Sequence, residues 1–147
     1  MALFSKERIL VPIDFSEKSL QALEETVAFA DTATSVHAVH VLKPLDAVEP
    51  GVVWESVDDN KRKATVQTLF EETCSGSGYE GLHFSVEKGD PTAEIIDYAE
   101  KHQITLIVMP SRGRTGISRF FMGSIAERVI RFAPCPVLVL RQQTQPG

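Results

Sequence analysis

The sequence is poor in cysteine and tryptophan, and it contains no long hydrophobic run. Two cysteines among 147 residues, Cys74 and Cys135, exclude a disulfide scaffold and a zinc site made of four thiolates. The apolar runs are far shorter than the roughly 18 residues that a transmembrane helix needs. Residues 1–8 lack the long apolar core of a secretory signal. These absences favour a cytoplasmic protein without a membrane partner.

A surplus of positive charge is missing as well. Fifteen basic residues stand against twenty acidic ones, which gives a formal net charge of −5. That balance disfavours broad binding to nucleic acid or to anionic membranes. The basic residues are nevertheless clustered, because residues 111–141 hold six arginines and one glutamate and so carry +5 against −10 elsewhere. This distribution favours a local anionic ligand.

What the sequence does contain is the composition of an ordinary globular domain. Hydrophobic residues make up 43% and charged residues 24% of the chain, close to the average for soluble proteins. A length of 147 residues matches one domain of roughly 150 residues. We expect a single domain over residues 1–147, with its core at about 8–141 and a flexible tail at 142–147.

Short apolar runs alternate with amphipathic stretches along the chain. The apolar runs are rich in β-branched residues and too short for helices, which indicates buried strands. We expect these strands at 9–13, 36–42, 82–86, 104–109 and 137–140. We expect helices from the Ser16 cap, over 57–74, from Asp90-Pro91 and near 123–133. The alternation predicts an α/β fold, with a mostly parallel sheet covered by helices on both faces.

Residue spacing within these elements predicts which side chains are buried. Helical spacing predicts that the first helix buries Leu20, Leu23, Val27 and Ala30, and that the second buries Val66, Leu69 and Phe70. In the second strand, His37 and His40 are three residues apart and therefore point to opposite faces. They cannot share a metal ion, and each is expected to be a core or surface histidine.

The segment after the fourth strand is rich in glycine and arginine. In parallel sheets of this kind, ligands sit beyond the carboxyl ends of the strands where the strand order reverses. Residues 110–124 lie there, and Gly123-Ser124 opens the next helix. Glycines let the backbone approach a ligand, and a helix N-terminus presents unpaired N–H groups. The segment predicts an anion site, phosphate above all, with an ordinary crossover loop as the alternative.

Asp14 is the second candidate, because it is a lone acid at the end of a buried strand. Its carboxylate would accept a ribose hydroxyl or hold a metal ion. The alternative is an Asx turn or a helix cap together with Ser16. The chain carries no P-loop motif, and we find no motif of a nucleophile with its base, so we expect no catalytic residue.

At this point the residues match a known family. The chain resembles the universal stress protein family from Ile9 to Arg141. The resemblance is carried by Ile9–Ser16, His40-Val41, Ile107–Gly116, Met122–Val129 and Pro134–Val139. It implies a Rossmann-like fold of the adenine nucleotide α-hydrolase type, with strand order 3-2-1-4-5. It also implies dimers and a role in the stress response.

The resemblance further implies a nucleotide site. Members that hold ATP carry the motif Gly-x-x-Gly-x9-Gly-Ser/Thr, of which Gly113, Gly123 and Ser124 stand in this sequence. By similarity these three take the phosphates, the Val41 backbone reads adenine, and Asp14 meets ribose or, through the phosphates, Mg or Mn. The residues expected to bind the nucleotide are Pro12, Ile13, Asp14, Val41, Pro110, Arg112, Gly113, Arg114, Gly123, Ser124 and Ile125.

The first motif position departs from the family, since Pro110 replaces the glycine. Proline removes a backbone donor and adds a ring where the ligand would pass. Three consequences stay open: weaker binding, a shift to another nucleotide, or no effect if only a carbonyl is used there.

The fifth strand is expected at an edge of the sheet, with Val137–Leu140 apolar on both faces. An exposed apolar edge recruits another chain, so antiparallel pairing of two such edges predicts a two-fold homodimer.

Three hypotheses follow for the function. The first is a dimeric sensor or regulator that binds ATP or another adenine nucleotide without efficient turnover. The second is a slow metal-dependent ATPase, and the third is a nucleotide-free interaction module closed by Pro110.

Overall fold

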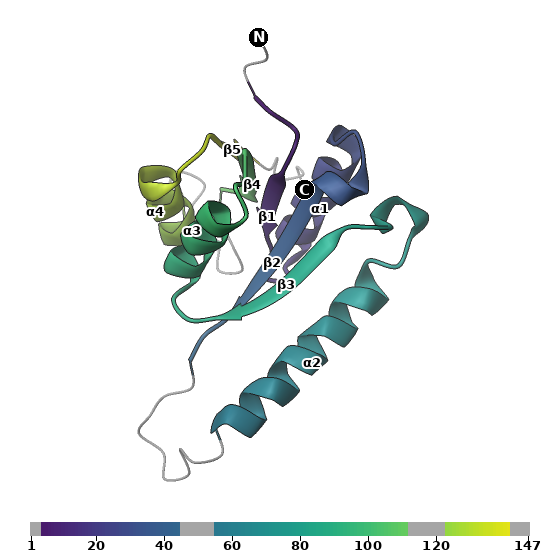
Figure 1. Ribbon diagram of the computed structural model, residues 1–147, viewed down its shortest axis with the longest axis vertical. Helices are drawn as coiled ribbons and strands as arrows, with labels where there is room; N and C mark the ends of the chain where they lie inside the picture. Colours follow the sequence, from purple (N-terminus) through teal and green to yellow (C-terminus); the bar gives the residue numbers. More distant parts are fainter. Residues whose placement is uncertain (1–3, 45–54, 112–122, 142–147) are drawn as a thin grey trace, which may run out of the picture.

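The computed structural model describes residues 4–44, 55–111 and 123–141. Five parallel strands form one sheet in the order β3-β2-β1-β4-β5 (Figure 1). The strands are β1 (Ile9–Pro12), β2 (Val36–Leu42), β3 (His83–Lys88), β4 (Leu106–Pro110) and β5 (Val137–Leu140). The predicted fold class and strand order are therefore confirmed.

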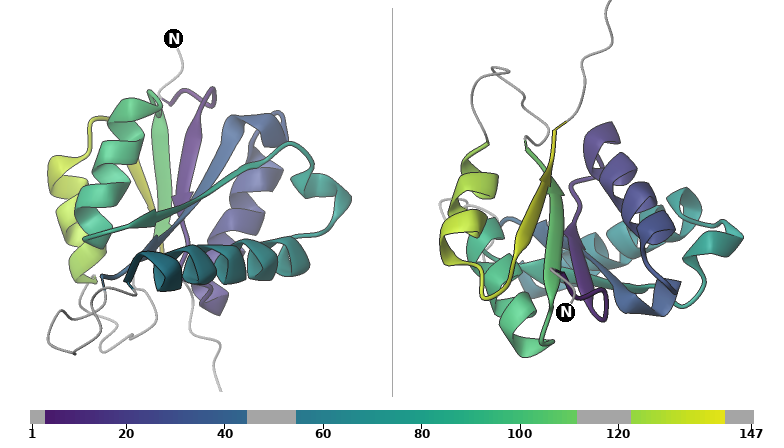
Figure 2. Two further views of the ribbon diagram at one scale, coloured as in Figure 1. Left: turned by 60° about the horizontal axis from the view of Figure 1, so that its bottom comes forward. Right: turned by 90° about the horizontal axis from the view of Figure 1, so that it is seen from above.

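Helices cover both faces of the sheet (Figure 2). The helices are α1 (Glu17–Phe29), α2 (Glu55–Thr73), α3 (Pro91–Lys101) and α4 (Ser124–Phe132), with short 3₁₀ turns η1 (Ala33–Ser35) and η3 (Ser77–Tyr79). Helices α1 and α2 pack on one face, and α3 and α4 pack on the other. None of the helices in the described part is long and apolar enough to cross a membrane.

Two helix starts are built as the sequence predicts. The Ser16 side chain accepts a hydrogen bond from the Ser19 N–H at 3.2 Å and caps α1. Asp90 accepts from the Ala93 N–H at 3.0 Å and caps α3, with Pro91 in the first helical position. A side-chain oxygen at this position pairs with an N–H that has no partner inside the helix.

The buried faces of α1 and α2 differ from the prediction. In α1, Ser19, Ala22, Leu23 and Thr26 are buried, whereas Leu20, Val27 and Ala30 are only half-buried. The two buried hydroxyls are satisfied within the helix, because Ser19 donates to the Ser16 carbonyl and Thr26 to the Ala22 carbonyl. In α2, Phe70 is buried and stacks on Phe84, but Leu69 is 42% exposed.

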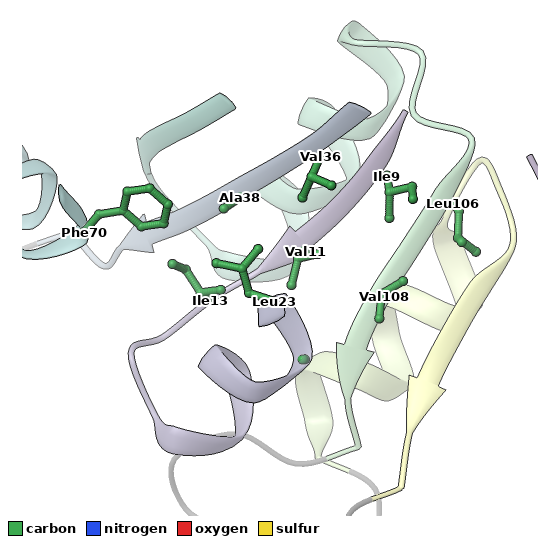
Figure 3. Close-up of a cluster of buried hydrophobic side chains, with 10 residues drawn as sticks. Ile9, Val11, Ile13, Leu23, Val36, Ala38, Phe70, Leu106 and Val108 are labelled. Atoms are coloured by element: carbon green, nitrogen blue, oxygen red, sulfur yellow. The ribbon is translucent and has the colours of Figure 1, made fainter. Parts of the chain in front are cut away.

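The two faces of the sheet have separate hydrophobic cores. The core under α1 and α2, shown in Figure 3, is formed by Ile9, Val11, Ile13, Ala22, Leu23, Val36, Ala38, Phe70, Leu106 and Val108. The core under α3 and α4 is formed by Leu10, Val39, Ile95, Tyr98, Ala99, Ile104, Ile107, Met109, Ala126 and Val129. Successive residues of β1 and β4 alternate between these cores, as the period of a strand requires.

The two histidines of β2 lie on opposite faces, as predicted. His37 is buried and forms a 2.7 Å hydrogen bond with the Tyr98 hydroxyl of α3. The His40 Nδ1 hydrogen bonds to the Ile13 carbonyl at 2.8 Å, and its ring meets Phe15 edge-on. His40 therefore belongs to the turn between β1 and α1.

Candidate functional site

The sheet separates at its centre, at the carboxyl ends of β1 and β4. Pairing between β1 and β4 ends at Leu10 and Ile107. Each strand nevertheless continues to pair with its outer neighbour, β1 with β2 as far as Pro12 and β4 with β5 as far as Pro110. The two ribbons diverge beyond Val11 and Val108 (Figure 3). This is the point where the strand order reverses, and ligands of such sheets bind there.

Two prolines explain why the strands separate. The Leu106 N–H donates to the Arg8 carbonyl at 3.3 Å, so strand alternation makes residues 8, 10 and 12 of β1 face residues 106, 108 and 110 of β4. The next two hydrogen bonds of this ladder would need the N–H groups of Pro12 and Pro110. Proline has no N–H, and the ladder therefore stops before these residues.

Asp14 lies directly beyond β1, in a turn held by hydrogen bonds. Its Oδ1 accepts from the Ser16 N–H at 2.9 Å, and its own N–H donates to Ser19 Oγ at 3.2 Å. The Asx turn that the sequence offers as an alternative is therefore present. An ionised carboxylate has room for several hydrogen bonds, so this turn is compatible with a ligand role. The ligand role of Asp14 stays a prediction.

The register of β1 and β2 places Asp14 and Val41 at the same level of the sheet. Pro12 pairs with Val39, and the Ile13 N–H donates to the Val39 carbonyl at 2.8 Å. Asp14 and Val41 each follow two residues later. Val41 is half-buried and packs against the core under α3 and α4. Both predicted residues therefore lie toward the carboxyl ends of two neighbouring strands.

Sequence reasoning missed the support behind this turn. Phe15 has a φ of 61°, a left-handed conformation that is uncommon for a bulky residue. The His40 ring contacts Phe15 and hydrogen bonds the Ile13 carbonyl, so it fixes both sides of Asp14. The resemblance pointed to the His40-Val41 pair, but nothing in the sequence says what the imidazole contacts.

The start of α4 is tied to the end of β4. The Gly123 N–H donates to the Ser111 carbonyl at 2.7 Å, and the Ser111 N–H donates to the Leu140 carbonyl at 3.1 Å. Gly123 caps α4 without a side chain, while Ser124 and Ile125 are exposed in its first turn. The positive end of the α4 dipole therefore lies beside the separated strands. Of the other predicted residues, Arg112, Gly113 and Arg114 lie outside the described residues.

The start of α3 is a helix N-terminus as well, but several carboxylates lie near it. Burial, and then the carboxylates of Asp97, Glu87 and Asp90, raise the pKa of Glu94. Arg128 of α4 lies 3.6 Å from the Asp90 carboxylate, an exposed pair that adds little stability. The α3 end of the carboxyl edge is therefore acidic and suits ligand groups that donate hydrogen bonds.

Two other features of the molecule bear on ligand binding. A hollow of about 630 Å³ lies beside β3, lined by side chains of α2, β3 and α3 that include Gln67, His83, Phe84 and His102. It contains none of the residues that the sequence predicts to bind a nucleotide. Across the described ranges, no three His, Cys, Asp or Glu side chains are grouped so as to hold a metal ion.

The comparison with known families is decisive. Residues 6–141 match the model of the universal stress protein family. The chain belongs to this family. Among its curated members, universal stress protein MJ0531 of Methanocaldococcus jannaschii is 32% identical over 141 residues, which cover 92% of this chain and 82% of the relative. The resemblance inferred from the motifs is thus confirmed.

Solved structures of the family share the fold. Protein MJ0577 of the same organism superposes with a TM-score of 0.75 at 28% identity, covering 95% of this chain and 99% of that one. A universal stress protein in complex with cAMP has a TM-score of 0.64 at 16% identity, covering 93% and 98%. A family protein of Arabidopsis thaliana with AMP bound has a TM-score of 0.60 at 17% identity, covering 93% and 92%.

Proposed function

We propose that this universal stress protein binds an adenine nucleotide, ATP foremost, where β1 and β4 separate. In this proposal it acts as a dimeric cytoplasmic sensor or regulator of the stress response, without efficient turnover. The observation that carries the proposal is the interrupted β1–β4 ladder, flanked by Asp14 on one side and by the start of α4 on the other. Two proteins of the same fold, solved with cAMP and with AMP, support adenine as the base.

The electrostatics of the edge suggest how the nucleotide lies. The phosphates would sit at the N-terminus of α4, near Gly123 and Ser124, because a helix N-terminus attracts anions. Arg112, Gly113 and Arg114 of the intervening segment would complete that end. The ribose would lie at Asp14 and the base at the Val41 backbone. Mg or Mn would enter with the phosphates, on the Asp14 side.

Pro110 is compatible with this arrangement. It is buried at the end of β4, and strand alternation puts its ring on the same face as Leu106 and Val108, toward α1. Because Pro12 and Pro110 both lack the N–H that would close the ladder, the proline helps to keep the two strands apart. This supports a nucleotide site over the closed, nucleotide-free module.

We expect binding without efficient turnover. Phosphoryl transfer depends on positioning and on a residue that orients the attacking water. The contacts of Asp14 described above fix the turn between β1 and α1, and no described contact favours the slow ATPase over binding alone.

The dimer is the second part of the proposal. β5 is the last strand of the sheet, and Leu138 is 37% exposed on it. On the neighbouring helix α4, Ile125 and Phe132 are 39% and 59% exposed. An apolar strand edge beside exposed apolar side chains favours association with a second copy of the chain.

The direct test is calorimetric titration with ATP, ADP, AMP and cAMP. We expect saturable binding to the wild-type protein and its loss in Gly123→Val, because a branched side chain would stand where the phosphates approach the helix. Gly76→Val is the matched control, since an added Cβ at Gly76 would make only an ordinary contact, 3.8 Å from Tyr79. The proposal is wrong if the wild-type protein binds none of these nucleotides at millimolar concentration.

A further inference from the structure

One buried hydroxyl near the proposed site has no partner in the described part of the chain. Thr92 is 2% exposed, and its Oγ1 makes no hydrogen bond with any of the described residues. Buried hydroxyls are paired in the great majority of cases, because an unpaired one loses its bonds to water without replacement. The hydroxyls of Ser19 and Thr26, which are equally buried, both have partners. Thr92 is therefore an exception that calls for a ligand.

Helical spacing places Thr92 over the carboxyl end of β2. Thr92, Ile95 and Ala99 form the inward face of α3, and Ile95 packs in the same core as Val39. Helix α3 runs against the direction of the strands, so Thr92 lies about 4.5 Å further toward their carboxyl ends than Ile95. Val41 lies about 6.6 Å beyond Val39 in the same direction. Thr92 and Val41 therefore both lie toward the carboxyl edge, on the same face of the sheet.

A contact at the other end of the segment supports this placement. The Gly89 N–H donates to the Leu42 carbonyl at 2.9 Å, which attaches the start of α3 to the end of β2. Gly89 has a φ of 148°, a conformation that is essentially restricted to glycine. The turn into α3 is thus fixed against β2.

The charges around Thr92 decide which part of a nucleotide it meets. Glu87 and Asp90 lie near Glu94 at this end of α3, and burial, followed by the carboxylates of Asp97, Glu87 and Asp90, raises the pKa of Glu94. Arg128 lies 3.6 Å from Asp90 and offsets part of this negative charge. Carboxylates repel phosphates, whereas the exocyclic amine of adenine carries partial positive charge and donates hydrogen bonds. The base end of the ligand fits here, and the phosphate end fits at α4.

We propose that the Thr92 hydroxyl hydrogen bonds the adenine base and accepts from its amino group, beside the Val41 backbone. This inference rests on the proposed function, since it names a further residue of the same site. Because a hydroxyl can also donate to a 6-oxo group, the informative comparison is a purine that has only a hydrogen in place of the 6-amino group.

The experiment compares Thr92→Val with Thr92→Ser in calorimetric titrations with ATP and with purine riboside triphosphate, which lacks the 6-amino group. Valine keeps the shape of threonine and removes the hydroxyl, whereas serine keeps the hydroxyl. We expect Thr92→Val to bind ATP about tenfold more weakly than wild type, as for the loss of one hydrogen bond. Thr92→Ser is expected to stay within about threefold, and purine riboside triphosphate to bind both variants like wild type.

Thermal unfolding without nucleotide provides an independent readout. Because the hydroxyl has no partner among the described residues, Thr92→Val should melt at the wild-type temperature or above it. A lower melting temperature, or equal ATP binding by Thr92→Val and wild type, would overturn this inference and leave the proposed function standing. A wild-type protein that binds no ATP would overturn both.

Discussion

Two prolines at residue scale determine where this sheet opens. Pro12 and Pro110 lie on the facing sides of β1 and β4, and their missing N–H groups end the ladder at Leu10 and Ile107. The sequence showed both prolines, but predicting their effect required the register of two strands that lie almost 100 residues apart in the chain. The hydrogen bonding of Thr92 and His40 could not be predicted from the sequence either, because it depends on tertiary packing.

His37 gives the clearest pH dependence at this scale. Burial, and then the neighbouring charges of His83, His102 and Arg8, lower the pKa of His37 to about 4. Because the unfolded chain then binds a proton more readily than the folded one, stability is full above the ordinary pKa of about 6.5 and falls as the pH drops toward 4. Urea unfolding at pH 7.5 and 4.5 should show a loss on the order of 2 kcal/mol from this residue.

The variant His37→Asn isolates that contribution. Asparagine keeps a polar group near the Tyr98 hydroxyl, to which the His37 Nδ1 is hydrogen bonded at 2.7 Å, but it does not titrate. We expect the variant to lose less stability than wild type between the two pH values. Equal losses in the two proteins would show that His37 is not the titrating group.

At the scale of elements, sequence pattern was most reliable for strands and helix starts. The bounds of β2 and β5 and the caps at Ser16 and Asp90 match the prediction, because a β-branched run and a side-chain cap are local signals. The inward face of α1 was predicted only in part: Leu23 is buried and Val27 and Ala30 pack against the core, but two polar residues of that face were missed. A hydrophobic pattern treats serine and threonine as polar and so assigns them to the exposed face. Ser19 and Thr26 are nevertheless buried, because their hydroxyls donate to backbone carbonyls within the α1 segment.

The open edge of β5 yields a prediction about assembly. The carbonyls of Pro136 and Leu140 accept from Ile107 and Ser111 of the β4 segment, so alternation directs the N–H groups of Val137 and Val139 to the open edge. If two β5 edges pair, Val139→Pro removes a donor of the interface and spares the ladder to β4. We expect this variant to be a folded monomer in size-exclusion chromatography with light scattering.

The variant Val139→Thr is the control, because it keeps the N–H and the branched shape. It should remain dimeric, with a circular dichroism spectrum like that of wild type. A dimer that persists in a folded Val139→Pro protein would place the interface elsewhere.

At the scale of the whole molecule, the charge differs between the two ends of the carboxyl edge of the sheet. The α3 end is acidic, with Glu87, Asp90 and Glu94, while the α4 end presents a helix N-terminus. The sequence predicted the fold class and, through its family resemblance, the strand order, whereas the place of the site stays a prediction. It could not predict how charge divides along that edge, since this depends on how α3 and α4 lie side by side.

Amide chemical-shift mapping of the ¹⁵N-labelled protein with ATP tests the central claim most directly. The account predicts saturable shifts at Asp14, Val41, Ser111 and Ser124, where β1 and β4 separate. A spectrum unchanged at millimolar ATP, or shifts confined to the hollow beside β3 around His83 and His102, would contradict it.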